Sequence, residues 1–380
     1  MRSGGEALTV SGPTETDMYL SEVNQGDSKP AITPAAPSRR ASEDMELLRF
    51  AATLNKELAQ PLGRYYWPDM LLSAVLGYGA LFLAMVAGPV VAIVAGIAAI
   101  LLLYRASLFI HEISHMKRDA LPGFHGVWNL LVGVPLMIPS FMYEGVHTLH
   151  HQRQRYGTAL DPEYLPLSHM RPVTLLVFML VAAAAPVGFL LRNAVLVPLS
   201  FLLPPLRRVV MERYSALAIN PAFRRPEPDD RLRRSWTFWD IVAAIWAIGV
   251  VALTATGVVP LRAFLTYMAV ISGAMIINQI RTLVAHLWEN EGEEMSITDQ
   301  YLDSVNVPPP GVLPALWAPV GLRYHALHHL LPALPYHALG EAHRRLIAAM
   351  PVGTAYHGAN YPDLGGLVGR LVASSRRSAR

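Results

Sequence analysis

The feature that most constrains this chain is a run without any charged residue between Asp69 and Arg105. The run is too long for one membrane crossing, and Gly88-Pro89 breaks it near its middle. It therefore predicts two spanning helices, at about 69–87 and 90–110. Composition agrees, since 16% of the residues are charged, whereas about 25% is usual in soluble domains.

Further apolar stretches lie in the second half of the chain. Residues 238–257 and 262–282 predict a second helical pair. The stretch 173–206 is apolar except for Arg192-Asn193, and it is short for two full crossings. We predict a short, tilted hairpin that turns at this polar pair. Residues 125–142 are apolar but interrupted by glycine and proline, which favours a half-buried or re-entrant segment over a span.

These patterns predict an all-α fold, an integral membrane helical bundle of four spans and one hairpin. The N-terminal residues are rich in Ser, Gly, Pro and acidic residues, which is typical of a disordered tail without a signal peptide. An amphipathic pattern follows, which fits a helix on the membrane surface or an ordinary solvated helix. The predicted parts are a disordered tail (1–44), an amphipathic interfacial helix (45–64), the membrane domain (65–350) and a basic C-terminal tail (351–380).

Arginine sets the predicted orientation. The loop 207–234 contains eight arginines, whereas the turns at 88–89 and 258–261 contain no positive charge. The positive-inside bias places this loop, both chain ends and the adjacent ends of the helices in the cytoplasm. We predict a multi-pass protein, in the inner membrane if the source is bacterial.

Three histidine clusters stand at predicted span ends. Their sequences are His-Glu-Ile-Ser-His, His-Thr-Leu-His-His and His-Ala-Leu-His-His. Residues three or four apart share a helix face, so each cluster offers two or three imidazoles to one point. A chain without cysteine has no thiolate ligand, and imidazole suits iron, zinc, copper or nickel. We predict two metals bound by His111, His115, His147, His150, His151, His325, His328 and His329, with His286 as a ninth ligand.

The other histidines lack cluster spacing, and we expect solvated or capping roles for His125, His169, His337, His343 and His357. Because all the ligands must lie on one side of the membrane, an even number of crossings must separate His151 from His286. The pair at 238–282 supplies two, so the stretch 173–206 must contribute none or two.

This motif set resembles that of the membrane fatty acid desaturase family, over roughly residues 65–345. The resemblance implies a non-haem di-iron centre with the nine histidines as ligands, dioxygen as the oxidant, and hydrogen abstraction from an acyl C–H bond. The chain starts its last cluster with His325, where front-end desaturases have Gln, and it lacks both the His-Pro-Gly-Gly haem motif and the additional box of alkane hydroxylases. Thr282 stands where family structures have an Asn that holds a metal-bound water.

Acidic residues close to the clusters are candidates for accepting the distal N–H of a ligand imidazole, which fixes its tautomer. Solvated acids at the membrane rim are the alternative. Asp161, in Asp161-Pro162-Glu163, is the best candidate, and the others are Glu112, Glu144, Glu163 and Glu289.

Oxygen-dependent desaturation of an acyl chain is our leading hypothesis, and hydroxylation or oxidative decarboxylation on the same scaffold is the alternative. A histidine-lined transporter would need ligands at mid-membrane, whereas these lie at span ends. No flavin or nicotinamide fingerprint is recognisable, so we predict a separate ferredoxin- or cytochrome-type electron donor with its reductase. The Arg-rich loop would steer an acidic donor, or bind anionic lipid. We expect the bilayer and the acyl substrate as further partners, and no nucleic acid.

Overall fold

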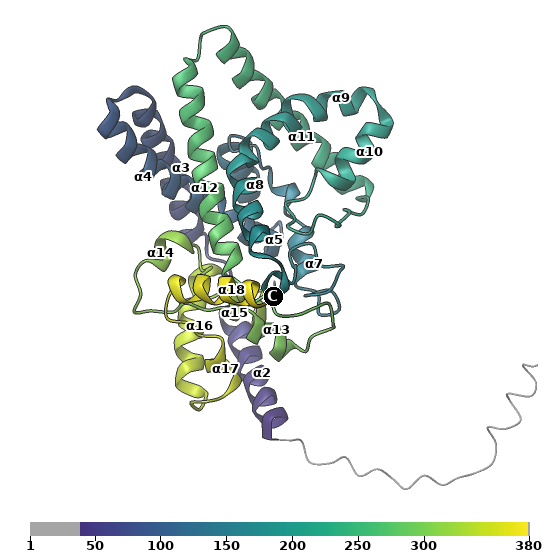
Figure 1. The fold of residues 1–380 in the computed structure, drawn as a ribbon, viewed down its shortest axis with the longest axis vertical. Coiled ribbons are helices and arrows are strands. Elements are labelled where there is room, and N and C mark those ends of the chain that lie inside the picture. Colours follow the sequence, from purple (N-terminus) through teal and green to yellow (C-terminus); the bar gives the residue numbers. More distant parts are fainter. Residues whose placement is uncertain (1–38, 379–380) are drawn as a thin grey trace, which may run out of the picture. The chain divides into compact units, whose positions relative to one another are not determined.

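The computed structural model describes residues 39–378, with the side chains of residues 44–377 (Figure 1). The chain divides into the units Met1–Ser42 and Glu43–Arg380, and apart from the start of the first helix the second contains everything discussed below. Across the described residues the structure is helical, with isolated β-bridges and no strand. The predicted all-α fold is therefore confirmed, whereas the predicted disordered tail lies almost wholly outside the described residues.

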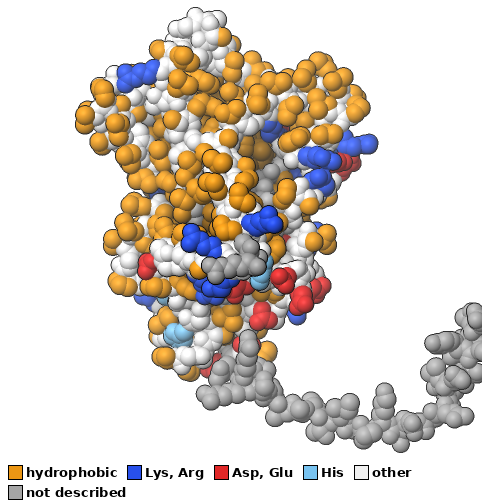
Figure 2. Space-filling model, viewed as in Figure 1, with side chains coloured by type: hydrophobic (Ala, Val, Ile, Leu, Met, Phe, Trp, Pro, Cys, Tyr) orange, Lys and Arg blue, Asp and Glu red, His pale blue; other side chains and the backbone are white. Residues whose placement is uncertain are grey.

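Within residues 39–378, five helices are long and apolar enough to cross a membrane. Four of them confirm the predicted pairs, and the fifth occupies the stretch for which we predicted a hairpin. Hydrophobic side chains cover the faces of these helices in view (Figure 2), as expected for a multi-pass membrane protein. The five are α3 (Gly63–Val86), α4 (Pro89–Ser107) with α5 (Phe109–His115), α8 (Pro172–Leu191) continuing to Leu202, α11 (Asp230–Ala255) and α12 (Leu261–Leu283).

The helices α3 and α4 form a tight hairpin. Pro89 is the first residue of α4, where its missing amide hydrogen costs nothing. Gly77 lies so close to Leu103 that a β-carbon at Gly77 would come within 2.7 Å of the leucine side chain. Arg105 pairs with Asp69 at 2.6 Å. The two charges that bound the apolar run therefore neutralise each other between the helices.

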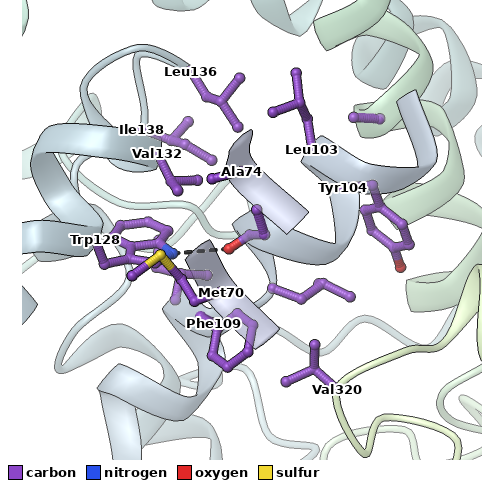
Figure 3. Close-up of a cluster of buried hydrophobic side chains, with 14 of the residues drawn as sticks. Met70, Ala74, Leu103, Tyr104, Phe109, Trp128, Val132, Leu136, Ile138 and Val320 are labelled. Carbon is purple, nitrogen blue, oxygen red and sulfur yellow. Dashed lines mark hydrogen bonds between the residues drawn. The ribbon is translucent and has the colours of Figure 1, made fainter. Parts of the chain in front are cut away.

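A buried hydrophobic cluster fixes the start of α5. Trp128 is fully buried, and its indole N–H donates to the carbonyl of Ala106 at 2.9 Å. Met70 and Phe109 lie close to Trp128 in the same cluster (Figure 3). Since Phe109 is the first residue of α5, this packing holds the helix that carries the first histidine cluster.

The stretch 173–206 differs from the predicted hairpin, and the predicted turn at Arg192-Asn193 is wrong. One helix runs from Pro172 to Leu202 through a π-helical turn, η4 (Arg192–Leu196). Arg192 is buried and pairs with Asp240 of α11 at 2.8 Å. Asn193 is also buried and donates to the carbonyl of Met137 at 3.1 Å. Polar residues inside a span usually face the bundle interior, and these two connect helices rather than forming a turn.

The chain reverses later, at Leu203, between α9 (Val197–Leu202) and α10 (Pro204–Arg213). Figure 1 shows α9 and α10 to one side of α8 and α11. The loop after α10 returns to the second histidine cluster, since Leu217 N donates to Met142 O at 2.8 Å. The chain is therefore back beside the residues that precede the second histidine cluster before α11 begins. We expected no crossing or two in this stretch, whereas it contains one helix that is long and apolar enough to cross a membrane, followed by a return through α10 and a loop.

Residues 116–171 form short helical pieces and loops, and no span was found there. As predicted for residues 125–142, the chain lies partly buried, with Trp128 inside and Leu130 exposed. The pieces are α6 (Phe124–Trp128), η1 (Asn129–Gly133), η2 (Ser140–Met142), α7 (Val146–His150) and η3 (Leu167–His169).

The segments at the two ends of the described chain pack against the rest of the protein. In α2 (Arg39–Leu58) the apolar residues Leu47, Ala51 and Leu54 are buried in a cluster with Leu327, so this face contacts protein, and the predicted position at the membrane surface stays a prediction. The predicted basic tail contains a helix, α18, with buried leucines. The helices after α12 are α13 (Ile297–Asp303), α14 (Pro314–Trp317), α15 (His325–Leu330), α16 (Tyr336–Ala349), α17 (Ala355–Gly358) and α18 (Leu364–Ser378).

Candidate metal centre

Three short helices and one loop carry the clustered histidines. The first cluster lies on α5, the second on α7 with its following residue, and the third on α15. Gly145 precedes α7 with a φ of 76°, a left-handed conformation that glycine adopts without strain. His286 stands three residues after the end of α12, where it meets α15.

In the described part of the chain these histidines form two groups with metal-binding geometry. In each group, one ring nitrogen per residue lies within 4.8 Å of all the others. The first group is His111, His115, His147 and His328, and the second is His150, His286, His325 and His329. His151 joins the first group, since its Nε2 lies 3.0 Å from that of His147 and 3.1 Å from that of His328. The structure thus brings together all nine histidines that the sequence singled out.

Each His-x-x-His-His cluster is divided between the two groups. His147 and His151, four residues apart, face the first group, whereas His150 faces the second. The third cluster is arranged the opposite way, with His325 and His329 in the second group and His328 in the first. Around a helix, position i+4 is rotated from position i by about 40° in one direction, and position i+3 by about 60° in the other. One helix can therefore direct the first and last histidines of a cluster to one metal position and the middle histidine to a neighbouring one. We expected the histidines of each cluster to face one point, which is wrong for these two clusters.

The arrangement fits metal ions. Within the second group, Nε2 of His325 lies 3.0 Å from that of His286 and 3.2 Å from that of His329. Octahedral coordination with metal–nitrogen bonds of about 2.1 Å would place adjacent ligand atoms about 3.0 Å apart. Several buried ring nitrogens have no hydrogen-bond partner among the described residues: both of His111, Nε2 of His115 and Nδ1 of His325. Polar ring nitrogens buried in this way are costly unless something binds them.

Carboxylates orient two of the rings. Asp161 is fully buried, and its Oδ2 accepts from Nδ1 of His150 at 2.9 Å. Nδ1 of His147 lies 3.0 Å from Oε2 of Glu163, which also accepts from the Tyr143 hydroxyl at 3.2 Å. In both rings the bonded Nδ1 leaves Nε2 free to face the metal position, as in carboxylate–histidine–metal triads.

A tyrosine connects His286 to a carboxylate that the sequence analysis missed. The Tyr156 hydroxyl accepts from Nδ1 of His286 at 2.8 Å and donates to Oδ2 of Asp303 at 2.7 Å. Tyr164 donates to the other oxygen of Asp303 at 3.1 Å. Tyr156 and Asp303 are 147 residues apart, so no local spacing could have indicated this connection.

Burial keeps most of these imidazoles neutral, which is the form that binds metals. It lowers the pKa of His147, His286 and His328 well below the usual value, and repulsion from the neighbouring histidines adds to the effect, with Arg281 contributing at His286. His150 differs, because burial lowers its pKa but the Asp161 carboxylate beside it outweighs burial, so its pKa is raised. His150 is thus the ring most strongly held by a negative charge.

Comparison with known proteins agrees with this geometry. The family model described as fatty acid desaturase matches residues 86–360. This chain belongs to the fatty acid desaturase family. It is also 48% identical over 339 residues to a protein named ceramide hydroxylase from Caulobacter vibrioides (strain NA1000 / CB15N), a match that covers 89% of this chain and 96% of the relative. No solved structure matches the chain.

Membership of this family makes the chain a membrane-bound non-haem di-iron oxidoreductase, as the motifs indicated. The histidine groups carry the donor set that such a centre requires. Which residues bind iron in this desaturase-family protein stays a prediction, to which the geometry adds a division of the nine histidines into five and four.

Two of the predicted acidic partners lie elsewhere. Glu112 accepts from the Tyr66 hydroxyl and from Tyr336 N, and its nearest oxygen is 3.7 Å from Nδ1 of His111. Glu144 lies 2.6 Å from Nε2 of His125. Both were predicted from closeness in sequence, but the carboxylate of Glu112 contacts α3 and α16, and that of Glu144 contacts α6.

Glu289 and the remaining histidines also lie outside the two groups. Glu289 pairs with Arg370 on the surface at 2.8 Å. His343 is buried and bonded to the Tyr356 hydroxyl, and His125 is bonded to Glu144 and Ser140. The other three contact backbone atoms: His169 with Glu289 O, His337 with Leu62 N and His357 with Met350 O.

A cavity of about 320 Å³ adjoins the histidines. Its inner wall includes rings of both groups, such as His111, His147 and His286. Away from them it is bounded by α8 and α12, with apolar residues including Val181 and Phe189. Ligand sites are typically apolar clefts with a few placed polar groups. This desaturase-family protein thus has space for an apolar chain beside its histidines.

Proposed function

We propose that this protein hydroxylates an acyl chain of an N-acyl lipid, in a reaction that consumes dioxygen. The observation that carries the proposal is the 48% identity, over 89% of this chain, to a protein named ceramide hydroxylase. That relative supports hydroxylation, our alternative, more than desaturation, which was our leading hypothesis. The family match is compatible with either outcome.

The two reactions differ in their products. In hydroxylation, the C–H bond breaks, one oxygen atom of dioxygen forms the new alcohol, and the other leaves as water with two protons and two electrons from a donor. Desaturation consumes the same oxygen, protons and electrons, but it removes a second hydrogen, forms an alkene and releases both oxygen atoms as water. The two are therefore distinguished by the fate of the oxygen.

The proposed iron ligands are His111, His115, His147, His151 and His328 for one ion, and His150, His286, His325 and His329 for the other. Two iron ions bound there would supply dioxygen activation for attack on an unactivated C–H bond. Asp161, Glu163 and Tyr156 hold three of the rings through Nδ1, so the ligand nitrogens need little rearrangement when metal binds.

The cavity would bind the acyl chain and exclude water from the reacting carbon. Apolar side chains of α8, of α12 and of the junction between α4 and α5 line it, and among them are Ala185, Met275 and Leu108. Holding a flexible chain against these walls would place one carbon at the histidines, which is the positioning that an unactivated substrate requires.

The two electrons would come from a separate redox protein at the histidine end of the bundle, which we place in the cytoplasm. Arg153 is exposed just after the second cluster, and the loop from α10 to α11 lies nearby. A positive surface would speed docking of an acidic donor such as a ferredoxin. Turnover that is independent of ionic strength, or a label that reaches Arg224 from outside the cell, would contradict this assignment.

The test of the reaction is isotopic. The purified, iron-loaded protein is supplied with a ceramide, an electron donor and ¹⁸O₂, and the lipid product is analysed by mass spectrometry. Hydroxylation predicts an alcohol that carries one labelled oxygen. A product that has lost two hydrogens and carries no label would show desaturation instead, and a lipid shortened by one carbon would show oxidative decarboxylation.

A further inference from the structure

The cavity-lining face of α12 changes from apolar to polar as the helix approaches the histidines. Met275, Asn278, Gln279 and Thr282 line the cavity at positions i, i+3, i+4 and i+7, which share one face of a helix. The facing wall, from α8, presents Val181, Ala182, Ala185 and Phe189. Polar side chains in the last two turns of a spanning helix are costly, and they indicate a functional site.

Two of the polar groups in this region lack a partner. Nε2 of Gln279 and Nε of Arg281 are buried and have no hydrogen-bond partner among the described residues. Both residues line the cavity. The Arg281 guanidinium contacts the side chains of Asn278 and Thr282 at 3.4 and 3.2 Å. In the described chain it forms no ion pair. Both unpartnered atoms are donors, so the missing partner is an acceptor, such as a carbonyl or hydroxyl oxygen.

The cavity also reaches the lipid-facing surface. Val181 lines the cavity and is 62% exposed on α8. A lipid in the adjacent leaflet has its head group at the end of the spans, where the histidines lie, and its chain points to the mid-plane. A lipid that enters sideways through this opening would therefore place its head group near the polar end of α12 and its chain along α8.

We propose that Gln279 and Arg281 bind an oxygen of the substrate's head group, and thereby place one of the first few carbons of the acyl chain at the histidine centre. This proposal rests on the proposed function and adds the position of oxidation to it. The substrate class is a membrane-resident N-acyl lipid, whose amide carbonyl is a strong acceptor next to the chain. Gln279 and Arg281 are positioning residues, and the apolar wall of α8 follows the rest of the chain.

The experiment compares the iron-loaded wild type with two variants in lipid bilayer discs. Gln279→Met removes the unpartnered amide nitrogen of Gln279 while keeping the size, and Arg281→Lys removes the unpartnered Nε–H of Arg281 while keeping the charge. Arg262→Lys is the matched control on the same helix, because Arg262 lies at the far end of α12 and donates to Ala87 O. A ceramide with a saturated chain is the substrate. The readouts are KM, kcat, bound iron and the position of the new hydroxyl group, located by fragmentation mass spectrometry.

The wild type is expected to hydroxylate one carbon near the amide. Each test variant should raise KM about tenfold, as for the loss of one buried hydrogen bond to the substrate. The product should spread over several chain positions while bound iron stays unchanged, and Arg262→Lys should match the wild type.

A wild-type hydroxyl group in the middle or at the far end of the chain would overturn the inference and leave the proposed function standing. An unchanged KM and an unchanged hydroxylation position in both Gln279→Met and Arg281→Lys would also overturn the inference. The position of the hydroxyl group in the wild-type product tests the inference even if a variant loses iron or fails to fold. If the wild type yields an alkene from every N-acyl lipid, or no oxidised product, the proposed function itself fails.

Discussion

The two histidine groups differ in how their rings are held. In the second group, Asp161 accepts from His150, and Tyr156 connects His286 to Asp303. In the first group, His147 alone is bonded to a carboxylate at hydrogen-bond distance, that of Glu163, and both ring nitrogens of His111 lack a hydrogen-bond partner among the described residues. Two rings of the second group are therefore held by hydrogen bonds to these side chains, whereas only one ring of the first group is held by a carboxylate. A metal should bind the second group more tightly.

The strongest test of this comparison uses two neighbouring residues, because His328 faces the first group and His329 the second. We expect His328→Ala and His329→Ala each to reduce turnover by more than about 100-fold, since one imidazole is lost from a set that acts as a unit. His328→Ala should keep the iron bound by the second group and lose the iron bound by the first. His329→Ala should weaken iron binding by the second group. Iron content and Mössbauer spectra check this.

The matched control is His169→Ala, which removes an exposed imidazole outside both groups and should keep iron and turnover. If the residual iron of the two cluster variants has the same spectrum, the division of each cluster between two sites is wrong. Full activity of His111→Ala, His147→Ala or His325→Ala would contradict the ligand assignment itself.

A smaller effect is expected when a ring loses its carboxylate. Asp161→Asn replaces the acceptor of His150 Nδ1–H by a neutral amide, and we expect iron to be lost about 10–100-fold more readily to a chelator. Glu163→Gln should change retention less, because Tyr143 also contacts His147 Nδ1, at 2.9 Å. Chelator competition at fixed pH measures both, and a larger loss for Glu163→Gln would reverse the comparison.

Tyr156→Phe should have a milder effect. It removes the hydroxyl group between His286 and Asp303, although Ser304 Oγ still lies 3.2 Å from His286 Nδ1. The loss of one neutral hydrogen bond predicts a weakening of iron binding by about fivefold. The same chelator assay measures it, and a loss as large as that of Asp161→Asn would show that the tyrosine, rather than the carboxylates, organises the second group.

The smallest effect on iron is expected for Glu144→Gln. Glu144 contacts His125, Ser140 and Arg118 rather than a ring of either group. We predict unchanged iron content and a loss of stability of about 1 kcal/mol, visible as a lower Tm. A loss of iron with unchanged Tm would restore the role that its closeness in sequence suggested.

These differences show which parts of the site can be predicted from the sequence. The eight clustered histidines and Asp161 are found from spacing, because helical periodicity and short loops bring neighbours in sequence together in space, and His286 is found from its place shortly after the last span. Tyr156 and Asp303 meet only through the fold, and so do Arg192 and Asp240, which are 48 residues apart. A polar pair in an apolar run was interpreted as a turn because its buried partner could not be seen. In the same way, closeness to a cluster did not reveal where the carboxylates of Glu112 and Glu144 point.

The most direct test of the account is the iron stoichiometry of the purified wild-type protein, measured with ⁵⁷Fe by Mössbauer spectroscopy alongside protein quantification. Two histidine groups of this composition predict two irons per chain, with two distinct environments. One iron per chain, a single environment, or protein that is active with zinc alone would contradict the division of nine histidines between two sites.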